Sequence, residues 1–415
     1  MNNKFKDLQI GTEETLRYIS VEGLILLIPI IGIKVLELNN SLIGLAISLS
    51  SIGYLLFGYT AGLIADKWNR QQVIITSLLA KSLCFGLFSY LVLSSNLNKL
   101  SYFFVICMIS LFLVIIETTI TAWIPDIYTN ENLSGINGVI QFSKSGANLI
   151  GPFLVGLSID KLGISWTLLL IATCLIISSL SILKVGKYVK PKNINLENKL
   201  LAKTNKKTKR LENVKYIFTN NVLRNLVFTT GTINFAISIY TAMVVIFLVG
   251  TLGLSTYLTG LVISLSGIGA LLGSFISPRL IKKFGVIKIM VFGPIIPSFG
   301  LLLASFAYEK MGVVLFIIGS ICFFTARSIG SVARVTVQQM VVPSHIRGEV
   351  SGTMIMLTWG TIPLGALCAG VLSDFIGVQQ VLMLAGIILI LSNCWLLNRG
   401  ILNLDDKRLN DRVVS

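Results

Sequence analysis

The segment GYTAGLIADKWNRQQ, residues 58–72, places an Asp, a Lys and an Arg directly after an apolar run that covers roughly residues 41–65. That run is long enough to cross the hydrocarbon core of a bilayer, which takes about 20 residues. The carboxylate of Asp66 then falls at the C-terminal end of a helix, where the backbone dipole already presents negative charge. An anion at that place needs a compensating partner, and the rest of the chain indicates which one.

The composition of the chain is that of an integral membrane protein. Hydrophobic residues make up 54% of the 415 residues and charged residues 13%, and the mean hydropathy is +0.84. An ordinary soluble domain carries about 25% charged residues. Apolar windows recur along the whole chain, which excludes a soluble protein with one membrane anchor. We predict an all-α integral membrane fold with twelve transmembrane helices, at residues 17–38, 41–65, 73–94, 101–124, 138–160, 164–184, 222–249, 257–279, 286–307, 311–342, 350–374 and 378–398.

The positive charge of the chain indicates its orientation. The net charge is +16, and residues 184–224 alone hold twelve Lys or Arg against two Glu. Lys and Arg gather in the cytoplasmic loops of membrane proteins. We therefore expect both termini and the central basic segment in the cytoplasm, and the chain in a bacterial plasma membrane. The segment KTNKKTKR lacks the aromatic and polar readers of a nucleic-acid site, so we expect no nucleic-acid partner.

Residue types that build catalytic or metal centres are scarce in this sequence. The six Cys lie inside apolar windows without a CxxC spacing, and His345 is the single His. Such Cys are typical of small buried apolar residues. The sequence has no G-x4-G-K-[ST] phosphate loop of an ATP-driven pump. We expect no enzyme activity, no metal and no cofactor.

Two parts of the sequence repeat one pattern. Residues 156–163 and 370–377 both read Gly-x3-Asp-x2-Gly, and each stands at the end of the fifth span of a half. Parallel repeats of six spans are typical of alternating-access transporters. We predict an N-terminal six-helix bundle at residues 1–184, a basic cytoplasmic linker at 185–220 with a short amphipathic helix around LENVKYIF, a C-terminal six-helix bundle at 221–400 and a cytoplasmic tail at 401–415.

The segment quoted first resembles the signature between spans two and three of the major facilitator superfamily, G-x-x-x-D-x-x-G-R-[RK]. Gly62, Asp66 and Arg70 match it, whereas Asn69 and Gln71 depart from it. The resemblance extends over the twelve spans, the central basic segment and both repeats. It implies two pseudo-symmetric six-helix bundles that work by alternating access.

The resemblance also implies a partner for the misplaced carboxylate. In this family the Asp is held by the positive N-terminal end of the eleventh span, here near Arg347, when the cytoplasmic side is shut. A helix N-terminus is a ready site for an anion. The alternative is a solvated loop Asp that Lys67 and Arg70 balance.

Span five carries a second family-like motif, GANLIGPFLVG. Gly151, Pro152 and Gly156 resemble the G-x-x-x-G-P-x-x-G-G motif of exporting antiporters, whereas Ala147 and Val155 replace two of its glycines. Pro bends a span and Gly permits close helix packing, so a plain packing kink is the alternative. The segments WIPDIYTNENLSGINGVIQF, GPFLVGLSIDKLG and, before span eleven, VPSHIRGEVSG resemble the macrolide-efflux and siderophore-exporter branch. With the motif of span five, this resemblance implies export.

Ionisable residues inside spans are costly and therefore functional candidates. Glu22, Lys81, Glu117 and Lys144 lie at a similar depth, which indicates a layer of paired charges. The alternative for the two lysines is to extend toward the headgroups, and we favour that alternative for Lys81.

Span ten adds Arg327 and Arg334, of which Arg334 nearly matches Glu117 in the repeat. The family resemblance implies that both face a central cavity, and we predict that Glu117 with Glu22 carries a coupling proton. The alternative is a permanent structural ion pair. Asp160 and Asp374 at span ends are expected to cap structure. The remaining cavity lining is expected from residues that suit an amphiphilic molecule, namely Asn148, Asn234, Tyr240, Met243 and Trp359.

The sequence thus predicts proton-coupled efflux of an amphiphilic small molecule, such as a drug, an antibiotic or a siderophore-like metabolite. A nutrient importer and a lysophospholipid flippase on the same fold stay open as alternatives. The expected partners are the substrate, protons and membrane lipids, and the expected state is a monomer.

Overall fold

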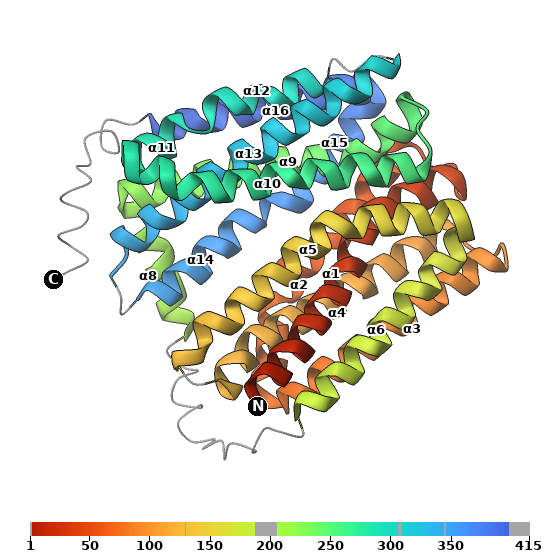
Figure 1. Cartoon of the computed structure of the whole chain (residues 1–415), viewed down its shortest axis with the longest axis horizontal. Helices are drawn as coiled ribbons and strands as arrows, with labels where there is room; N and C mark the ends of the chain where they lie inside the picture. Colours follow the sequence, from red (N-terminus) through yellow and green to blue (C-terminus); the bar gives the residue numbers. More distant parts are fainter. Residues whose placement is uncertain (1, 129, 187–205, 306–308, 344–345, 398–415) are drawn as a thin grey trace. The chain divides into compact units, whose positions relative to one another are not determined.

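The computed structural model describes residues 2–128, 130–186, 206–305, 309–343 and 346–397. Within those ranges every regular element is helical (Figure 1), which confirms the predicted fold class. The elements follow one another as α1 Asn2–Lys34, α2 Asn40–Lys67, α3 Arg70–Leu93, α4 Lys99–Ile127, α5 Asn130–Leu162, α6 Ile164–Gly186, α8 Lys206–Thr219, α9 Asn221–Val245, the π-helix η1 Ile246–Thr251, α10 Thr256–Phe284, α11 Val286–Phe292, α12 Ile295–Ser305, α13 Glu309–Val341, α14 Arg347–Trp359, α15 Thr361–Ile376, α16 Val378–Ser392 and the 3-10 helix η2 Asn393–Leu396.

Membrane-length apolar helices dominate the described part of the chain. Ten helical segments there are long and apolar enough to cross a bilayer. The two other predicted spans correspond to α5, which is long but more polar, and to the pair α11 and α12. The predicted ninth span is therefore interrupted. Pro294 cannot donate a backbone hydrogen bond and its ring obstructs the preceding turn, so the helix breaks after Phe292.

The chain divides into two compact units. Unit 1 comprises Met1–Lys190, Thr241–Leu265 and Ala366–Val378, and unit 2 comprises Pro191–Tyr240, Ser266–Gly365 and Gln379–Ser415. Parts of α9, α10 and α15 thus belong to unit 1, so these units differ from the two predicted halves, whose borders stay a prediction. The predicted tail at 401–415 and most of the linker lie outside the described residues.

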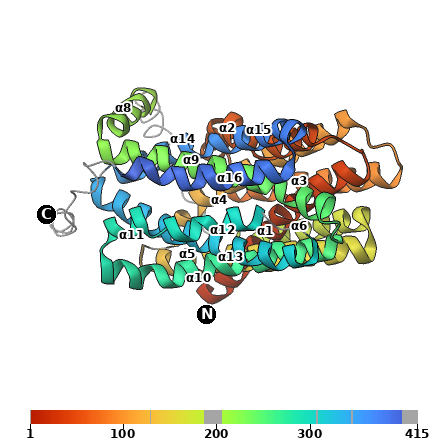
Figure 2. The same ribbon diagram turned by 90° about the horizontal axis from the view of Figure 1, so that it is seen from above.

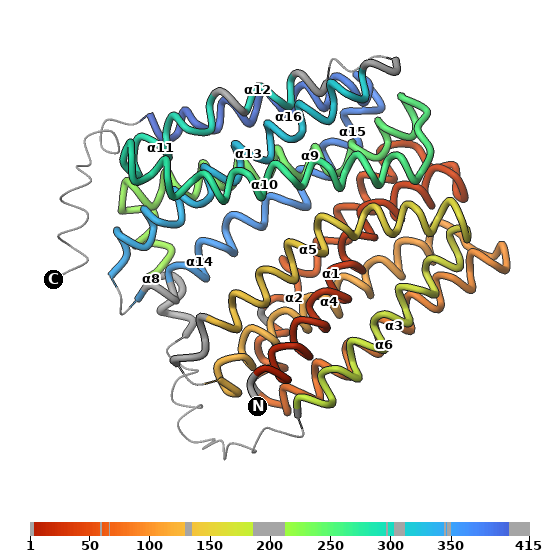
Figure 3. Tube along the Cα trace, in the orientation of Figure 1, coloured from red at the N-terminus to blue at the C-terminus, as the bar shows by residue number. Residues whose placement is uncertain are grey.

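Helices α1 to α6 form the larger part of unit 1. Helix α1 packs against α5 and α6, α3 packs against α4 and α6, and α2 packs against α4. Figure 3 shows α3 alongside α6 and α1 alongside α5, and Figure 2 gives a second view of the same helices. Tyr102 of α4 is fully buried and donates a hydrogen bond of 2.8 Å to the carbonyl oxygen of Ile28, which ties α4 to α1.

The two Gly-x3-Asp-x2-Gly repeats make matching contacts inside unit 1. Asp160 accepts a hydrogen bond of 2.9 Å from the backbone N–H of Tyr257, at the start of α10. Asp374 accepts bonds of 3.2 and 3.1 Å from the backbone N–H groups of Asn40 and Ser41, at the start of α2. Each carboxylate therefore caps the N-terminus of another helix, which confirms the predicted capping role and suits the positive end of the helix dipole.

Glycines of the same repeats permit these contacts. A Cβ added to Gly156 would lie 2.7 Å from the carbonyl oxygen of Thr256, and one added to Gly370 would lie 2.7 Å from that of Asn40. The closing glycines, Gly163 and Gly377, have φ values of 87° and 90°, a conformation that glycine adopts without a steric penalty. The sequence repeat is thus also a repeat of backbone geometry.

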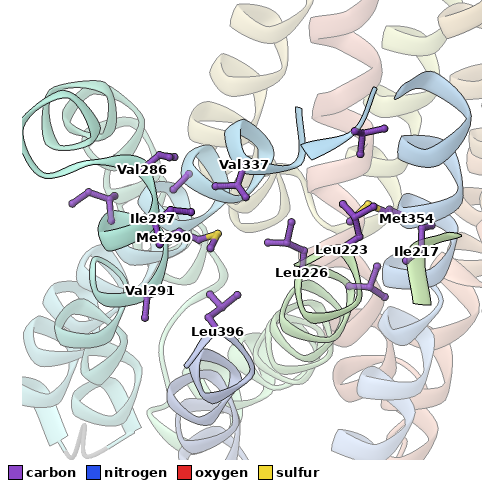
Figure 4. Packing of buried hydrophobic residues seen from close by; sticks show 14 of the residues in the cluster. Ile217, Leu223, Leu226, Val286, Ile287, Met290, Val291, Val337, Met354 and Leu396 are labelled. Carbon is purple, nitrogen blue, oxygen red and sulfur yellow. The ribbon is translucent and has the colours of Figure 1, made fainter. Parts of the chain in front are cut away.

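Unit 2 has a hydrophobic core of its own, which Figure 4 shows from close by. Met290 of α11, Leu226 of α9 and Leu396 of η2 are among its fully buried members. Ile217 of α8 joins this core, and α8 packs against α14. The predicted amphipathic helix around LENVKYIF is therefore confirmed, and its apolar side is covered by the unit.

Candidate functional site

A buried arginine forms the centre of a charge cluster in unit 1. The guanidinium of Arg17 donates from Nε to Glu13 Oε1 over 2.9 Å and from Nη2 to Glu14 Oε2 over 2.6 Å. Its Nη1 reaches Glu117 Oε1 on α4 over 3.3 Å. The side chains of Arg17, Glu13 and Glu14 are 1%, 0% and 1% exposed. One buried cation therefore binds three carboxylates, two of which are away from water.

Helical geometry explains how this cluster forms. Glu13 and Glu14 stand four and three residues before Arg17, and side chains at these spacings are neighbours on one helix face. The apolar stretch of α1 carries Arg17 into the bundle interior, where Glu117 of α4 meets it. Charge-assisted bonds to a guanidinium are among the strong hydrogen bonds of proteins.

Glu117 lies at the accessible edge of the cluster. Its side chain is 20% exposed, in contrast to the buried Glu13 and Glu14. Besides Arg17 it accepts a hydrogen bond of 2.9 Å from the hydroxyl of Tyr18 and a second from the hydroxyl of Tyr54. Three donors thus stabilise the carboxylate, and the two tyrosine hydroxyls come from α1 and α2.

Lys81 of α3 is buried in the same region. It is 0% exposed, and its Nζ donates a hydrogen bond of 2.9 Å to Ser20 Oγ of α1. The prediction that Lys81 extends toward the headgroups is wrong, because α3 turns this residue toward α1. A buried ammonium needs compensating negative charge, and the carboxylates of Glu13 and Glu117 act on Lys81.

Helix α5 contributes the remaining predicted charges. The Nζ of Lys144 lies 4.8 Å from the centre of the Tyr18 ring, within the range of a cation–π contact. Asn148, one turn further, donates from Nδ2 to Glu22 Oε1 over 2.8 Å. A Cβ added to Gly151 would lie 3.1 Å from the Cβ of Glu22. The glycine that precedes Pro152 in the exporter-like motif therefore lets α5 approach α1 beside this carboxylate.

We call the seven ionisable residues of this region the charge network: Glu13, Glu14, Arg17, Glu22, Lys81, Glu117 and Lys144. Arg17 binds three of the acids directly, Lys81 and Lys144 contact α1 at Ser20 and Tyr18, and Glu22 of the same helix binds Asn148 of α5. Four are acids and three are bases, so the fully ionised network holds one net negative charge. One acid oxygen is also unsatisfied, since Glu13 Oε2 is buried and has no hydrogen-bond partner in the described part of the chain. A buried acceptor without a donor is costly.

The sequence does not predict the innermost part of this network. Hydropathy puts Arg17 at the cytoplasmic border of a span that begins there, but α1 starts at Asn2 and encloses it. Glu13, Glu14, Tyr18 and Tyr54 are absent from the predicted site. The signal that could have found the first two is the Glu-Glu-x-x-Arg spacing on a helix that continues into an apolar run.

A second polar contact joins the N-terminal part of α1 to the residue after α4, and its Asp7 lines an open groove. The hydroxyl of Tyr128 donates to Asp7 Oδ1 over 2.6 Å. Burial, together with this hydrogen bond and the negative charge of Asp7, raises the pKa of Tyr128 above its ordinary value. The groove has a volume of about 520 Å³ and lies between α1 and α5, where its lining includes Asp7, Gly11, Thr12, Thr15, Val139 and Ser143.

The predicted gating arginine, Arg70, stands at the start of α3 and is held by α4. Arg70 forms an ion pair with Asp126 of α4 and donates from Nη1 to the carbonyl oxygen of Ala122 over 2.7 Å. A Cβ added to Gly62 would meet nothing within 4 Å. The side chains of Asp66 and Arg347 lie outside the described part of the structure, so their predicted contact stays a prediction.

The predicted arginines of span ten lie on α13, in unit 2. Arg334 is 7% exposed and Arg327 is exposed. Glu117 belongs to unit 1, so the prediction that Glu117 and Arg334 face one cavity stays a prediction. Among the described residues, no group of three or more His, Cys, Asp or Glu is placed to hold a metal ion.

Many membrane-length apolar helices, together with a buried set of charges inside unit 1, define a multi-pass membrane protein of the transporter class. Residues 15–362 match the sequence profile of the Major Facilitator Superfamily, and the chain belongs to this superfamily.

A relative from Bacillus subtilis (strain 168), the "Uncharacterized MFS-type transporter YuxJ", is 27% identical over 272 residues. The match covers 62% of this chain and 64% of that protein, so the chain spans just under two thirds of this relative's length.

Solved structures share the fold at low identity. A bacterial homologue of the iron transporter ferroportin has a TM-score of 0.75 at 14% identity, with 95% of this chain and 99% of that chain covered. A bacterial homologue of the human lysosomal transporter Spinster has a TM-score of 0.72 at 14% identity over 99% and 98%. The nucleoside transporter NupG has a TM-score of 0.65 at 17% identity over 96% and 100%.

Proposed function

We propose that this chain is a proton-coupled exporter that moves an amphiphilic small molecule out of a bacterial cell by alternating access. The observation that carries the proposal is the charge network, which has one more acid than bases. Ionisable groups inside membrane spans are rare and mark ion pathways. The chain is proposed to work as a monomer in the plasma membrane, with both termini in the cytoplasm and without a cofactor or an enzyme activity.

The exposures of the network support a division of labour among its acids. Glu117 is partly exposed and so exchanges the proton with the substrate pathway, whereas Glu13 and Glu14 stay enclosed. Arg17 joins all three, so a proton bound at Glu117 frees the guanidinium to bind Glu13 and Glu14 alone. Glu22 extends the same pathway along α1 toward Asn148.

Protonation of Glu117 changes its contacts with several neighbouring side chains at once. When Glu117 binds a proton, it loses its charge toward Arg17 and one of the lone pairs that accept from Tyr18 and Tyr54. These partners lie on α1 and α2, so the packing of two helices responds to one proton. A ligand shifts a conformational equilibrium only if it interacts differently with the two states, and this network offers such a difference.

The outward direction is supported by the resemblance of Gly151, Pro152 and Gly156 to the exporter motif. In unit 1, Gly151 faces Glu22 of the network, and Gly156 meets the start of α10. The motif therefore lies between the charge network and a helix contact that alternating access has to loosen. Import of a nutrient and flipping of a lysophospholipid are the other outcomes of the test.

Accumulation assays separate these functions. Cells that express the chain are loaded with a panel of amphiphilic dyes and macrolides, and the retained amount is compared with that of cells without it. Export predicts lower retention that collapses when the proton gradient is dissipated, and Glu117→Gln is expected to abolish the difference. The matched control is Glu212→Gln, an exposed acid on α8 outside the network.

Two other results of these assays would indicate import or lipid flipping instead of export. Higher retention in expressing cells indicates import, and movement of radiolabelled lysophospholipid between leaflets in proteoliposomes indicates a flippase. Export that stays coupled to protons in Glu117→Gln contradicts the proposed role of Glu117.

A further inference from the structure

Arg334 of α13 is a buried cation that has no described counter-charge. The residue is 7% exposed, and its Nη1 is fully buried without a hydrogen-bond partner. No hydrogen bond or ion pair joins its guanidinium to any residue in the described part of the chain. Arg17, which is also buried, differs from Arg334 because its guanidinium binds three carboxylates.

The charges around Arg334 do not compensate for its burial. Among the described residues, the charge that acts on it is that of Arg327, two helical turns earlier on α13. A guanidinium stays protonated at neutral pH, so Arg334 cannot escape the cost by losing its proton. Leaving a buried charge uncompensated costs several kcal/mol in general. A protein that keeps such a residue therefore needs a negative charge from elsewhere.

Local packing makes room for the guanidinium. A Cβ added to Gly330 would lie 2.7 Å from Nη1 of Arg334 and 2.8 Å from Cγ of Pro294. The guanidinium thus lies against a glycine, one turn earlier on α13, close to the break between α11 and α12. Arg327 marks the exposed end of the same helix face, since residues seven apart on a helix share a face.

We propose that Arg334, with Arg327 at its exposed side, binds an anionic group of the transported molecule, either a carboxylate or a phosphate. A guanidinium matches both groups because its planar fork donates two parallel hydrogen bonds. The inference rests on the proposed function and narrows it, because the amphiphilic substrate then carries a negative charge.

The binding test uses purified full-length protein in detergent and three simple probes at equal ionic strength. Sodium benzoate represents a carboxylate, sodium phosphate represents a phosphate, and benzamidine hydrochloride is the cationic counterpart of benzoate. Thermal unfolding is followed by intrinsic fluorescence. One of the two anions is expected to raise the Tm of the wild type in a saturable way, and benzamidine is not. The anion that acts identifies the group.

Three variants connect that shift to Arg334. Arg334→Met is expected to lose the anion-dependent rise in Tm, with at least a tenfold higher apparent Kd. Arg334→Lys keeps the positive charge but lacks the planar fork of the guanidinium. Its apparent Kd for the anion is expected to lie between those of the wild type and Arg334→Met. Arg279→Met, at an exposed cation on α10 that stacks on Phe275, is the matched control and is expected to behave like the wild type.

The stability without anion separates a binding role from a structural one. Removing an uncompensated buried charge relieves a cost, so Arg334→Met without anion is expected to unfold at the same temperature as the wild type or higher. An anion response retained by Arg334→Met, no response of the wild type to either anion, or a marked loss of stability in Arg334→Met each overturns the inference. Anion binding that persists in a chain without export contradicts only the proposed function.

Discussion

Replacing Arg17 by methionine tests whether the charge network holds unit 1 together. Methionine preserves most of the length and the apolar part of the side chain, but it removes the donors to Glu13, Glu14 and Glu117. Three carboxylates then lose their shared cation while two of them stay about 1% exposed or less. We expect a large loss of stability in a correctly inserted protein.

The magnitude follows from the burial of the pair. Removal of one partner of a buried ion pair costs about 3–5 kcal/mol. At roughly 2–4 °C per kcal/mol for a unit of about this size, the expected fall in Tm is on the order of 10 °C. The loss exceeds that of an exposed pair, for which about 0–1 kcal/mol is typical.

Thermal unfolding of the purified protein in detergent measures this effect. Arg279→Met, which removes an exposed arginine on α10, is the control for the loss of a positive charge. The double variant Glu13→Gln/Arg17→Met is expected to recover part of the lost Tm, because it removes one of the stranded carboxylates. Arg17→Met with a Tm within about 2 °C of the wild type, or a double variant less stable than the single one, refutes the reasoning.

Three further changes probe contacts elsewhere in unit 1, each by the Tm of the purified variant. Gly156→Ala brings a Cβ to 2.7 Å from the carbonyl oxygen of Thr256, so we expect a loss of about 1–3 kcal/mol from overpacking. Gly62→Ala, whose Cβ meets nothing within 4 Å, is the control, and its Tm is expected to equal or exceed that of the wild type because alanine favours a helix interior over glycine. Tyr102→Phe removes a buried donor 2.8 Å from the carbonyl oxygen of Ile28. We expect the free energy of unfolding to fall by about 1–2 kcal/mol, seen as a lower Tm, and an unchanged Tm contradicts the hydrogen bond. Asp374→Asn removes a negative charge from the start of α2, so a loss of about 0.3–1 kcal/mol is expected that shrinks in 1 M salt; a loss independent of salt contradicts the dipole argument.

The sequence predicts those features that depend on local pattern. Apolar length identifies the membrane helices, and the position of Asp160 and Asp374 at span ends predicts that they cap structure, which their contacts with α10 and α2 confirm. The family follows from Gly62, Asp66 and Arg70, and the match over residues 15–362 confirms it. These features need no knowledge of which helices are neighbours.

The features that the sequence does not predict depend on which helices pack together or on where a membrane span begins along the chain. Hydropathy alone makes Arg17 a flanking charge because it places the border of a span there, whereas helix α1 begins at Asn2. The same reasoning extends Lys81 to the headgroups, but α1 provides Ser20 as its hydrogen-bond partner. The break at Pro294 lies inside an apolar window, where hydropathy gives no warning of it.

The spacing of Glu13, Glu14 and Arg17 on a single helix has a consequence for biosynthesis. Helix α1 leaves the ribosome before α3 and α4 exist, so Lys81 and Glu117 cannot yet accompany it into the lipid. The arginine is already paired with two glutamates within about one turn of the nascent segment, which lowers the cost of inserting this arginine into a bilayer. The first helix thus enters the membrane with its own counter-ions and acquires the others as the later helices arrive.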